Sequence, residues 1–415
     1  MNRSIAAAPV LNYTTSVEQQ KLPDGNKNSI TNFGFEIKPH HYSHPFCKNW
    51  DCDHSLFNIA RAELSQWKKA DRLANPGINP KRAGRPRADI LQIFIIIYFQ
   101  TVTGCSLEKM MLQLESDLFL MATIYSHLGK KVKFPARSTI IKYQQLLNQD
   151  GIICRIFEAF IDYSLQIAKE VMGPAKDNDE PIEVGQAGAL DSSFLDVPIY
   201  KHSPEEALSI KHHKWEKDFA GKEVNFCSES QKDHMATWSK KNNISHHGHK
   251  LHLIEDVCSG LVVVLDTTPS NVHDSRKMIS LAMQCPDGMN RLYGDSAYGA
   301  KNKRKFLAKV CGIVVYASMR AYANKPLSDI AQEWNRYITH CRISVEHVFT
   351  YIKNTLHFKI RNKSYNMIVG VCTMAVTAYN VSRLQLIIDN RIHRLQRKSI
   401  AIWFMTVTIS WVLCS

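Results

Sequence analysis

The chain has 415 residues, of which 45% are hydrophobic and 22% charged, a composition that excludes a wholly disordered chain and a collagen-like repeat. Its 52 lysine and arginine residues exceed its 38 aspartate and glutamate residues, which gives a formal net charge of +14. This excess excludes a neutral surface and favours a polyanionic partner, either nucleic acid or an anionic membrane surface.

The cysteines and the N-terminus favour a compartment that keeps thiols reduced. Eleven cysteines are scattered from Cys47 to Cys414 without regular spacing, which argues against a disulfide framework. The first residues lack the apolar run of a signal peptide, so we expect no secretion.

The first part of the chain is expected to be a poorly ordered lead-in, residues 1–53, followed by an all-helical domain, residues 54–150. Apolar residues at helical spacing predict an amphipathic helix over 54–72. Residues 88–101 are almost continuously apolar, yet they are too short to cross a bilayer and predict a buried helix.

Residues that end or cap helices divide the rest of this helical region. Gly104 is expected to end the buried helix, and Ser106 to cap a helix over 107–115. A third helix should run through Ser126, and another should start at Ser138.

Basic connectors interrupt these helices. The cations that we expect to contact DNA here are Arg85, Arg87, Lys130, Lys131 and Arg137. Short helices joined by cationic segments are typical of helix-turn-helix modules, in which one helix enters the major groove and cations contact phosphates. A helical domain with solvated cations fits the same pattern.

From residue 187 the pattern changes to strands, within an expected α/β domain over residues 185–385. The predicted strands are 187–200, 248–257, 260–269, 291–299 and 312–319, the second and third joined as a hairpin. Helical stretches separate the later strands, which predicts a mixed sheet with covering helices. Residues 201–247 are expected to form an irregular surface excursion.

Residues 386–415 form a basic and then hydrophobic C-terminal tail. Its last stretch, 399–415, is uncharged but shorter than the roughly 20 apolar residues of a membrane span. We expect a buried helix or strand, or an unstructured tail, and no membrane partner; a tail anchor is the alternative.

Two aspartates stand at the ends of predicted strands, Asp191 after an apolar run and Asp295 after another. Ligands and metals gather at the carboxyl ends of strands in open α/β sheets, and two carboxylates there repel each other unless a cation joins them. A hard divalent ion such as Mg²⁺ would satisfy this pair.

A third acid, Glu346, lies on a predicted helix over 340–356, with Arg342 and Lys353 on the same face. A carboxylate between two cations suits phosphate chemistry, with the acid holding metal and the cations contacting DNA. An Arg–Glu ion pair on a solvated helix face is the alternative.

Four ordered blocks carry a resemblance to a known family. They are ALDSSF around Asp191, residues 247–275 (HGHKLHLIEDVCSGLVVVLDTTPSNVHDS), LYGDSAYG around Asp295, and RISVEHVFTYIK at 342–353. The chain resembles the DDE transposases of bacterial insertion sequences, in the group named after insertion sequence five. The resemblance extends upstream from GRPRADILQ and downstream to AYNVSRL, and so spans residues 80–385.

This resemblance implies an RNase H-like catalytic domain in which Asp191, Asp295 and Glu346 are both the catalytic residues and the metal ligands. It implies Mg²⁺, with Mn²⁺ as an alternative, cleavage of DNA at the terminal inverted repeats, and strand transfer to target DNA. Arg342 and Lys353 would contact DNA. We expect a homo-oligomer on DNA, because two ends must meet, in a bacterial cytoplasm and associated with the nucleoid.

One departure from the family pattern concerns a tyrosine that usually precedes the arginine of the last block. That position is Thr339 here, and Tyr337 is out of register. The departure keeps two other functions open: a decayed transposase that binds DNA ends without cutting them, and a metal-dependent nuclease of the same fold.

Other candidate ligands are set aside on spacing. Cys47 and Cys52, with His40, His41, His44 and His54 nearby, match no standard zinc pattern. A second group, His212, His213, His246, His247, His249 and His252, is expected to face solvent or DNA. Asp196 should point to the face opposite Asp191, and His273 with Asp274 should shape a turn near the site.

Overall fold

The computed structural model describes residues 49–74, 89–130, 133–172, 183–197, 233, 235–241, 243–322 and 326–389. Helices come first along the chain: α1 (Trp50–Ala74), α2 (Ile90–Thr103), α3 (Leu107–Ser116), α4 (Leu118–Leu128), α5 (Arg137–Gln149) and α6 (Ile152–Met172). The strands are β1 (Ala187–Asp196), β2 (Thr237–Lys241), β3 (Ile244–Asp256), β4 (Val262–Pro269), β5 (Arg291–Gly294) and β6 (Val314–Ala317). The later helices are α8 (Asp274–Ala282), η3 (Ser296–Tyr298), α9 (Lys301–Val310), α10 (Asp329–Thr350), η4 (Tyr351–Thr355) and α11 (Tyr365–Ile388).

The six described strands form one mixed sheet, in the order β2-β3-β1-β5-β6, and β4 also pairs with β3, along the stretch of β3 that pairs with β1. The strand β3 pairs antiparallel with β1, β2 and β4, whereas β5 pairs parallel with β1 and β6. Parallel pairing requires a crossover connection, and α9 supplies it between β5 and β6. The sheet with its helices confirms the α/β prediction and fits an RNase H-like fold.

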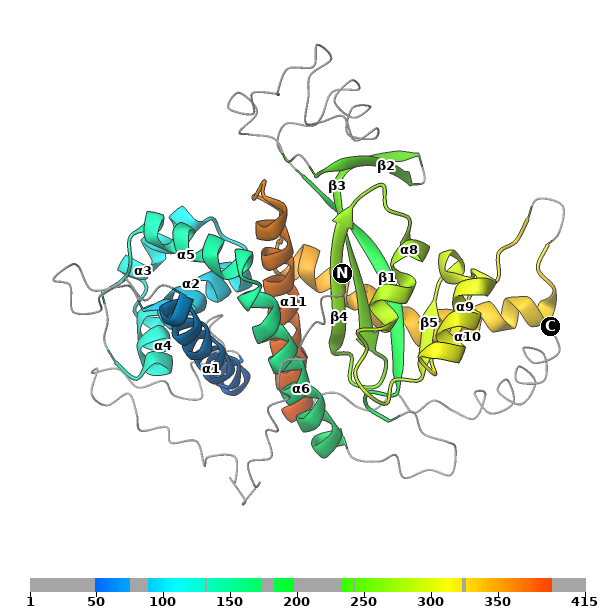
Figure 1. Ribbon diagram of the computed structural model, residues 1–415, viewed down its shortest axis with the longest axis horizontal. Coiled ribbons are helices and arrows are strands. Elements are labelled where there is room, and N and C mark those ends of the chain that lie inside the picture. The colour runs from blue at the N-terminus through cyan, green and yellow to red at the C-terminus, as the bar shows by residue number, and fades with distance from the viewer. Residues whose placement is uncertain are drawn as a thin grey trace, which may run out of the picture.

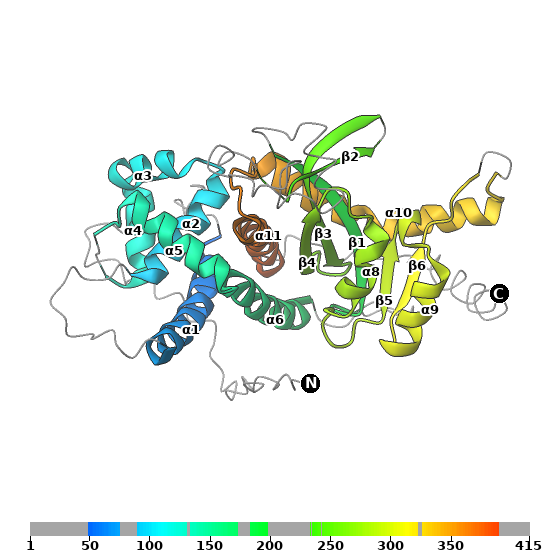
Figure 2. The same cartoon turned by 45° about the horizontal axis from the view of Figure 1, so that its top comes forward.

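Helices cover both faces of this sheet (Figures 1 and 2). The side chain of Asp191 points to the face covered by α10, since it meets Arg342 of that helix. The side chain of Asp266 lies on the other face, where Lys277 of α8 contacts it at 2.7 Å. Because strand side chains alternate between the two faces, odd-numbered residues of β1 point to the face covered by α10 and even-numbered residues point to the face covered by α8.

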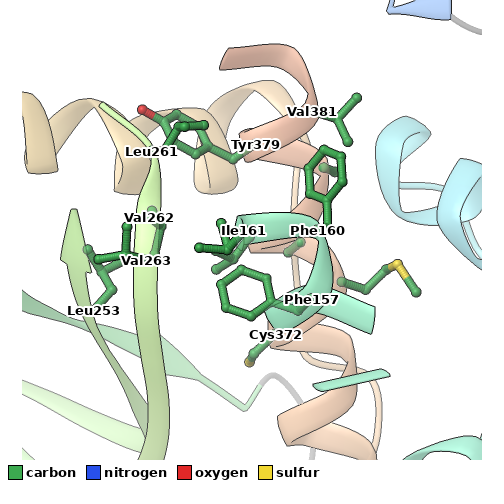
Figure 3. Packing of buried hydrophobic residues seen from close by; sticks show 14 of the residues in the cluster. Phe157, Phe160, Ile161, Leu253, Leu261, Val262, Val263, Cys372, Tyr379 and Val381 are labelled. Atoms are coloured by element: carbon green, nitrogen blue, oxygen red, sulfur yellow. The ribbon is translucent and has the colours of Figure 1, made fainter. Parts of the chain in front are cut away.

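The helix α11 stands between the N-terminal helices and the sheet (Figure 1). It packs against α6, α5, α2 and α1 on one side and against β4 on the other. Its Asn380 side chain clamps the start of β4, accepting from the Val262 N–H and donating to the Val262 carbonyl, both at 2.9 Å. The N-terminal helices and the sheet therefore share one continuous hydrophobic core, to which α6, β4 and α11 contribute Phe157, Val262 and Tyr379 (Figure 3).

This central position explains the composition of α11. Of the described helices, it is the one long and apolar enough by itself to cross a membrane, yet 83% of its most apolar stretch is buried inside the protein. A helix that is hydrophobic on all sides belongs in a core when other elements surround it. The hydrophobic tail 399–415 lies outside the described residues.

Several local predictions are confirmed. Gly104 ends α2 in the left-handed conformation, with φ 61°, and the Ser106 hydroxyl caps α3 by accepting from the Lys109 N–H. The predicted hairpin is formed by β3 and β4. The buried helix over 88–101 is α2, shifted by two residues.

One prediction is wrong in part, because residues 201–247 are not wholly irregular. The strand β2 pairs with the first residues of β3, and Lys241 lies opposite Ile244 across a two-residue turn. Asn243 in this turn has φ 63°, a conformation that asparagine tolerates better than most residues. The consecutive asparagines were the sequence signal for this hairpin.

Candidate active site

Asp191 and Asp295 lie side by side on neighbouring parallel strands. The last parallel pair of β1 and β5 joins Leu190 to Gly294, so the two aspartates occupy the next position on each chain. Strands in a sheet are about 4.8 Å apart, which brings the carboxylates together. We call Asp191 and Asp295 the aspartate pair.

The structure corrects one detail of the expected placement. Asp295 directly follows β5, as predicted, and its carboxylate accepts from the Ala297 N–H at 2.9 Å to cap η3. Asp191 does not end β1, which continues to Asp196 because β3 still pairs with it. What ends at Leu190 is the pairing of β1 with β5, and this is the physical reason the site opens there.

Charge at the aspartate pair is partly compensated by Arg342. One guanidinium nitrogen lies 3.0 Å from the Asp191 carboxylate, and both side chains are largely buried. Burial raises the pKa of Asp191 above its ordinary value, the Arg342 charge lowers it, and the neighbouring Asp295 raises it again. A cation beside Asp191 therefore favours its ionised form.

The sequence of α10 explains how Arg342 reaches the sheet. Ser328 caps the helix by accepting from the Ala331 N–H, and Asp329 complements the helix dipole in the first turn. The buried residues of α10 repeat at helical spacing and dock it on the sheet: Ala331, Trp334, Ile338, Cys341, Val345, Val348 and Phe349. Arg342 borders this buried stripe and so lies over β1.

Glu346 lies one helical turn beyond Arg342, on the same side of α10, and is exposed. Further along, Lys353 in η4 donates to the Ser193 hydroxyl at 2.7 Å, two residues beyond Asp191 on β1. Glu346 therefore sits between two helix positions that both contact the same strand. In the described part of the chain, however, no three acidic, histidine or cysteine side chains are close enough to hold one metal ion, so Glu346 does not join the aspartate pair here.

Tyr337 does not take the place of the tyrosine that the family resemblance leads us to expect at position 339. Thr339 is exposed on α10, three residues before Arg342. Tyr337 instead packs edge-on against Tyr293, with ring centroids 6.0 Å apart and the two hydroxyls 3.3 Å apart. Tyr337 is thus committed to packing against β5.

Residues 184–381 match the family described as Transposase DDE domain. This segment contains the aspartate pair, Arg342 and Glu346. Residues 184–381 form a transposase DDE domain.

A curated relative supports the same assignment. The transposase for insertion sequence element IS1106 of Neisseria meningitidis serogroup B is 32% identical over 130 residues, which is 31% of this chain and 43% of that protein. The match thus spans less than half the length of the relative. Both findings support the predicted resemblance to DDE transposases of bacterial insertion sequences.

Among solved structures, the chain is similar to the piggyBac transposase in its cryo-EM synaptic complex with hairpin DNA. The TM-score is 0.41 at 10% identity, and the alignment covers 84% of this chain and 77% of that one.

Behind the aspartate pair, the DDE domain holds a polar cluster that sequence reasoning did not assign. Lys250, almost fully buried on β3, donates to the Asp274 carboxylate at 3.0 Å and to the Val272 carbonyl at 2.9 Å. His273 caps α8, so His273 and Asp274 shape a helix start next to the site. A lysine flanked by histidines inside an apolar strand was the available signal for this cluster.

Tyr298 is a second unassigned residue of the DDE domain. Its ring packs over Gly294, where an added Cβ would lie 2.8 Å from the ring, and its hydroxyl is buried without a hydrogen-bond partner. Burial and the charges of Asp274, Asp191 and Asp295 raise its pKa well above the ordinary value. The tyrosine therefore lines the aspartate pair as a neutral side chain.

The histidine prediction is wrong for the central strand. His249 is buried and contacts Asp233 at 2.5 Å, and His252 is buried and bonded to Thr268 at 2.8 Å. Burial is the largest cause that lowers the pKa of His252, to about 4. These histidines face neither solvent nor DNA, because β3 is covered on both faces.

The other residues predicted from the sequence lie away from the aspartate pair or outside the described residues. Asp196 contacts the half-buried His246 at 3.1 Å, away from the aspartate pair. Lys130 pairs with Asp89 at 3.0 Å, and Arg137 is exposed at the start of α5. The other positions lie outside the described residues: Arg85, Arg87, Lys131, Cys47, His40, His41, His44, His212 and His213.

Proposed function

We propose that this chain binds the terminal inverted repeats of an insertion sequence and catalyses metal-dependent DNA cleavage and strand transfer. The observation that carries the proposal is the aspartate pair under Arg342 within a transposase DDE domain. Two adjacent carboxylates at the end of a parallel strand pair suit metal-assisted cleavage of a phosphodiester.

The residues fit a divalent cation, Mg²⁺ or alternatively Mn²⁺. Asp295 raises the pKa of Asp191 by like-charge repulsion, and a divalent ion between the carboxylates would relieve this repulsion. Asp191 and Asp295 would hold it, and Glu346 would complete the ligand set. Such ions supply Lewis-acid stabilisation of the phosphate and activate the attacking oxygen.

The chain's own cations would position the DNA around the aspartate pair. Arg342 favours the ionised form of Asp191 and borders the surface on which the scissile phosphate would lie. Lys353 is exposed beside Ser193, and would contact the DNA backbone further along the strand. A bidentate guanidinium and a point ammonium charge suit these two tasks.

The N-terminal helices would recognise the element ends. Lys130 and Arg137 flank the connector between α4 and α5, and Arg85, Arg87 and Lys131 belong to the same set of expected phosphate contacts. Because strand transfer joins two ends, we infer a homo-oligomer on DNA. A chain that acts on DNA in this way would reside in the bacterial cytoplasm, associated with the nucleoid.

One observation favours a second function, a decayed transposase that binds ends without cutting them. Thr339 stands where the family has tyrosine, and Tyr337 is bound to Tyr293 rather than available to replace it. A nuclease of the same fold that cuts without joining is separated from the main proposal by the strand-transfer product.

The test is cleavage and joining of a duplex that carries the DNA flanking this coding sequence, with and without Mg²⁺. Asp295→Ala and Glu346→Ala are compared with Asp287→Ala and Glu333→Ala, which remove exposed acids of the same type elsewhere. Loss of cutting in the first two variants alone, with DNA binding retained, supports the proposal. Binding without cutting by the intact chain supports the decayed transposase, and cutting by all variants overturns the assignment of the acids.

A further inference from the structure

A groove of about 580 Å³ lies along α9 and β6, and one end of it reaches the residue that follows Asp295 of the aspartate pair. It begins at Ser296, the residue after Asp295, and extends over α9 and β6 to Tyr322. We call it the edge groove, because β6 is the last strand on this side of the sheet. The end of the groove at Ser296 and Ser318 lies just past the carboxyl ends of β5 and β6, where ligands of α/β sheets bind.

Every charged residue that lines the edge groove is a cation. These residues are Lys301, Arg304, Lys305 and Arg320. Arg304 is half-buried and fixed, because its Nε donates to the Val315 carbonyl at 2.9 Å. Arg320 and Lys305 are exposed. The groove is therefore built to attract an anion next to a site that concentrates negative charge.

The outer wall of the edge groove is held in place by α10. Asn335 binds Met319 twice, accepting from its N–H at 2.7 Å and donating to its carbonyl at 2.9 Å. Trp334 donates from its indole N–H to the Ala317 carbonyl at 3.0 Å. The helix that carries Arg342 thus also fixes the wall that presents Arg320, so the two regions keep a constant separation.

The rest of the lining is mostly apolar, and three of its larger side chains are exposed to solvent. Tyr322 is 68% exposed, Met319 38% and Val314 37%. Exposed aromatic and apolar side chains among cations are the combination that binds sugars and bases alongside a phosphate backbone. An acidic peptide would use the cations alone and would gain nothing from a position beside the aspartate pair.

We propose that the edge groove binds the phosphodiester backbone of the DNA strand that adjoins the scissile phosphate. The proposal rests on the proposed function, since it takes the aspartate pair as the place where the phosphate is cut. The strand belongs either to the element end or to the target DNA. Both present the same chemistry, and the two steps of the reaction distinguish them.

The test uses the full chain and a double variant, Lys305→Ala with Arg320→Ala. Its matched control, Lys309→Ala with Arg336→Ala, removes two exposed cations that do not line the edge groove. Duplex binding is measured between about 50 and about 300 mM salt, the range over which phosphate contacts change affinity strongly. End cleavage and joining of pre-cut ends are followed separately. Thermal melting of each variant checks that it is folded.

The logarithm of the binding constant falls as the logarithm of the salt concentration rises. Loss of two phosphate contacts makes this fall less steep by about 1.8 for the groove variant, whereas the control keeps the slope of the parent. Impaired end cleavage assigns the groove to the element end, and impaired joining of pre-cut ends assigns it to the target. Parent slope, cleavage and joining in the groove variant overturn the inference while leaving the proposed function intact. If the intact chain never cuts, the proposed function fails and the slopes alone decide the groove.

Discussion

Replacing the buried acid Glu255 with glutamine should remove a large pH dependence of stability. Glu255 lies on β3 opposite Ala189, on the sheet face that α10 covers, and is 1% exposed. Burial raises the pKa of Glu255 from 4.5 to about 8, and it outweighs the Ser344 and Tyr379 hydroxyls and the Arg383 charge, which act to lower it. The folded protein therefore binds a proton that the unfolded chain releases above pH 4.5.

Because the folded state binds more protons in this range, the free energy of unfolding falls as pH rises, and the loss is complete above the folded pKa. The difference between 4.5 and about 8 corresponds to about 5 kcal/mol, of which about 3 kcal/mol is already lost at pH 7. Glutamine cannot ionise, so Glu255→Gln should lack this decline.

Urea unfolding of the parent and of Glu255→Gln, between about pH 4 and about pH 9, measures how the free energy of unfolding depends on pH. The difference between the two free energies should grow in favour of the variant by about 3 kcal/mol from the acid end to pH 7. Any constant cost of burying the amide shifts the whole curve and leaves this growth unchanged. Parallel curves would refute the reasoning, because Glu255 would then titrate alike in the folded and unfolded chain.

Three further predictions test the site and its supports. Gly104→Ala should cost about 3 kcal/mol or more of unfolding free energy and Gly129→Ala about 1 kcal/mol, measured in urea, because both glycines end helices with positive φ but only the first would meet Leu356, at 2.2 Å. Arg342→Gln should move the acid limb of the cleavage pH profile upward, since it removes the cation that lowers the pKa of Asp191; an unmoved limb contradicts this. Chelation of divalent ions should abolish cleavage and leave DNA binding within about twofold, measured by gel shift.

The local signals in the sequence predicted elements well, because each depends on neighbouring residues. The Ser106 cap, the Gly104 stop and the apolar run of α2 are properties of a few consecutive positions. The same holds for the β3–β4 hairpin. Their boundaries shifted by a few residues, since tertiary packing decides where an element ends.

The burial of β3 could not be predicted in the same way. His249 and His252 look like surface residues in the sequence, yet they are buried because strands and helices far along the chain cover both faces. Each has a polar partner that offsets its burial: Asp233 lies 16 residues before His249, and Thr268 lies 16 residues after His252. Polar partners at that range carry no periodic signal.

The candidate site was predicted in its parts but not in its pairings. The family motifs indicated Asp191, Asp295, Arg342 and Glu346 together, and the register of β1 with β5 brings the first two side by side. The ion pair of Arg342 with Asp191 was not foreseen, since the sequence predicted a DNA contact for Arg342, with an ion pair to Glu346 as the alternative. Which carboxylate an arginine meets depends on how α10 crosses β1.

The central position of α11 has a mechanical consequence. A linker between a DNA-recognition part and a cutting part would let the two rotate independently, and the distance from the recognised sequence to the cut could then vary. Here one helix packs against the N-terminal helices along one side and is hydrogen-bonded to β4 along the other. Under the proposed function, in which the N-terminal helices recognise DNA and the aspartate pair cuts it, the spacing between the two would be set by this packed helix, and lengthening a loop would not change it.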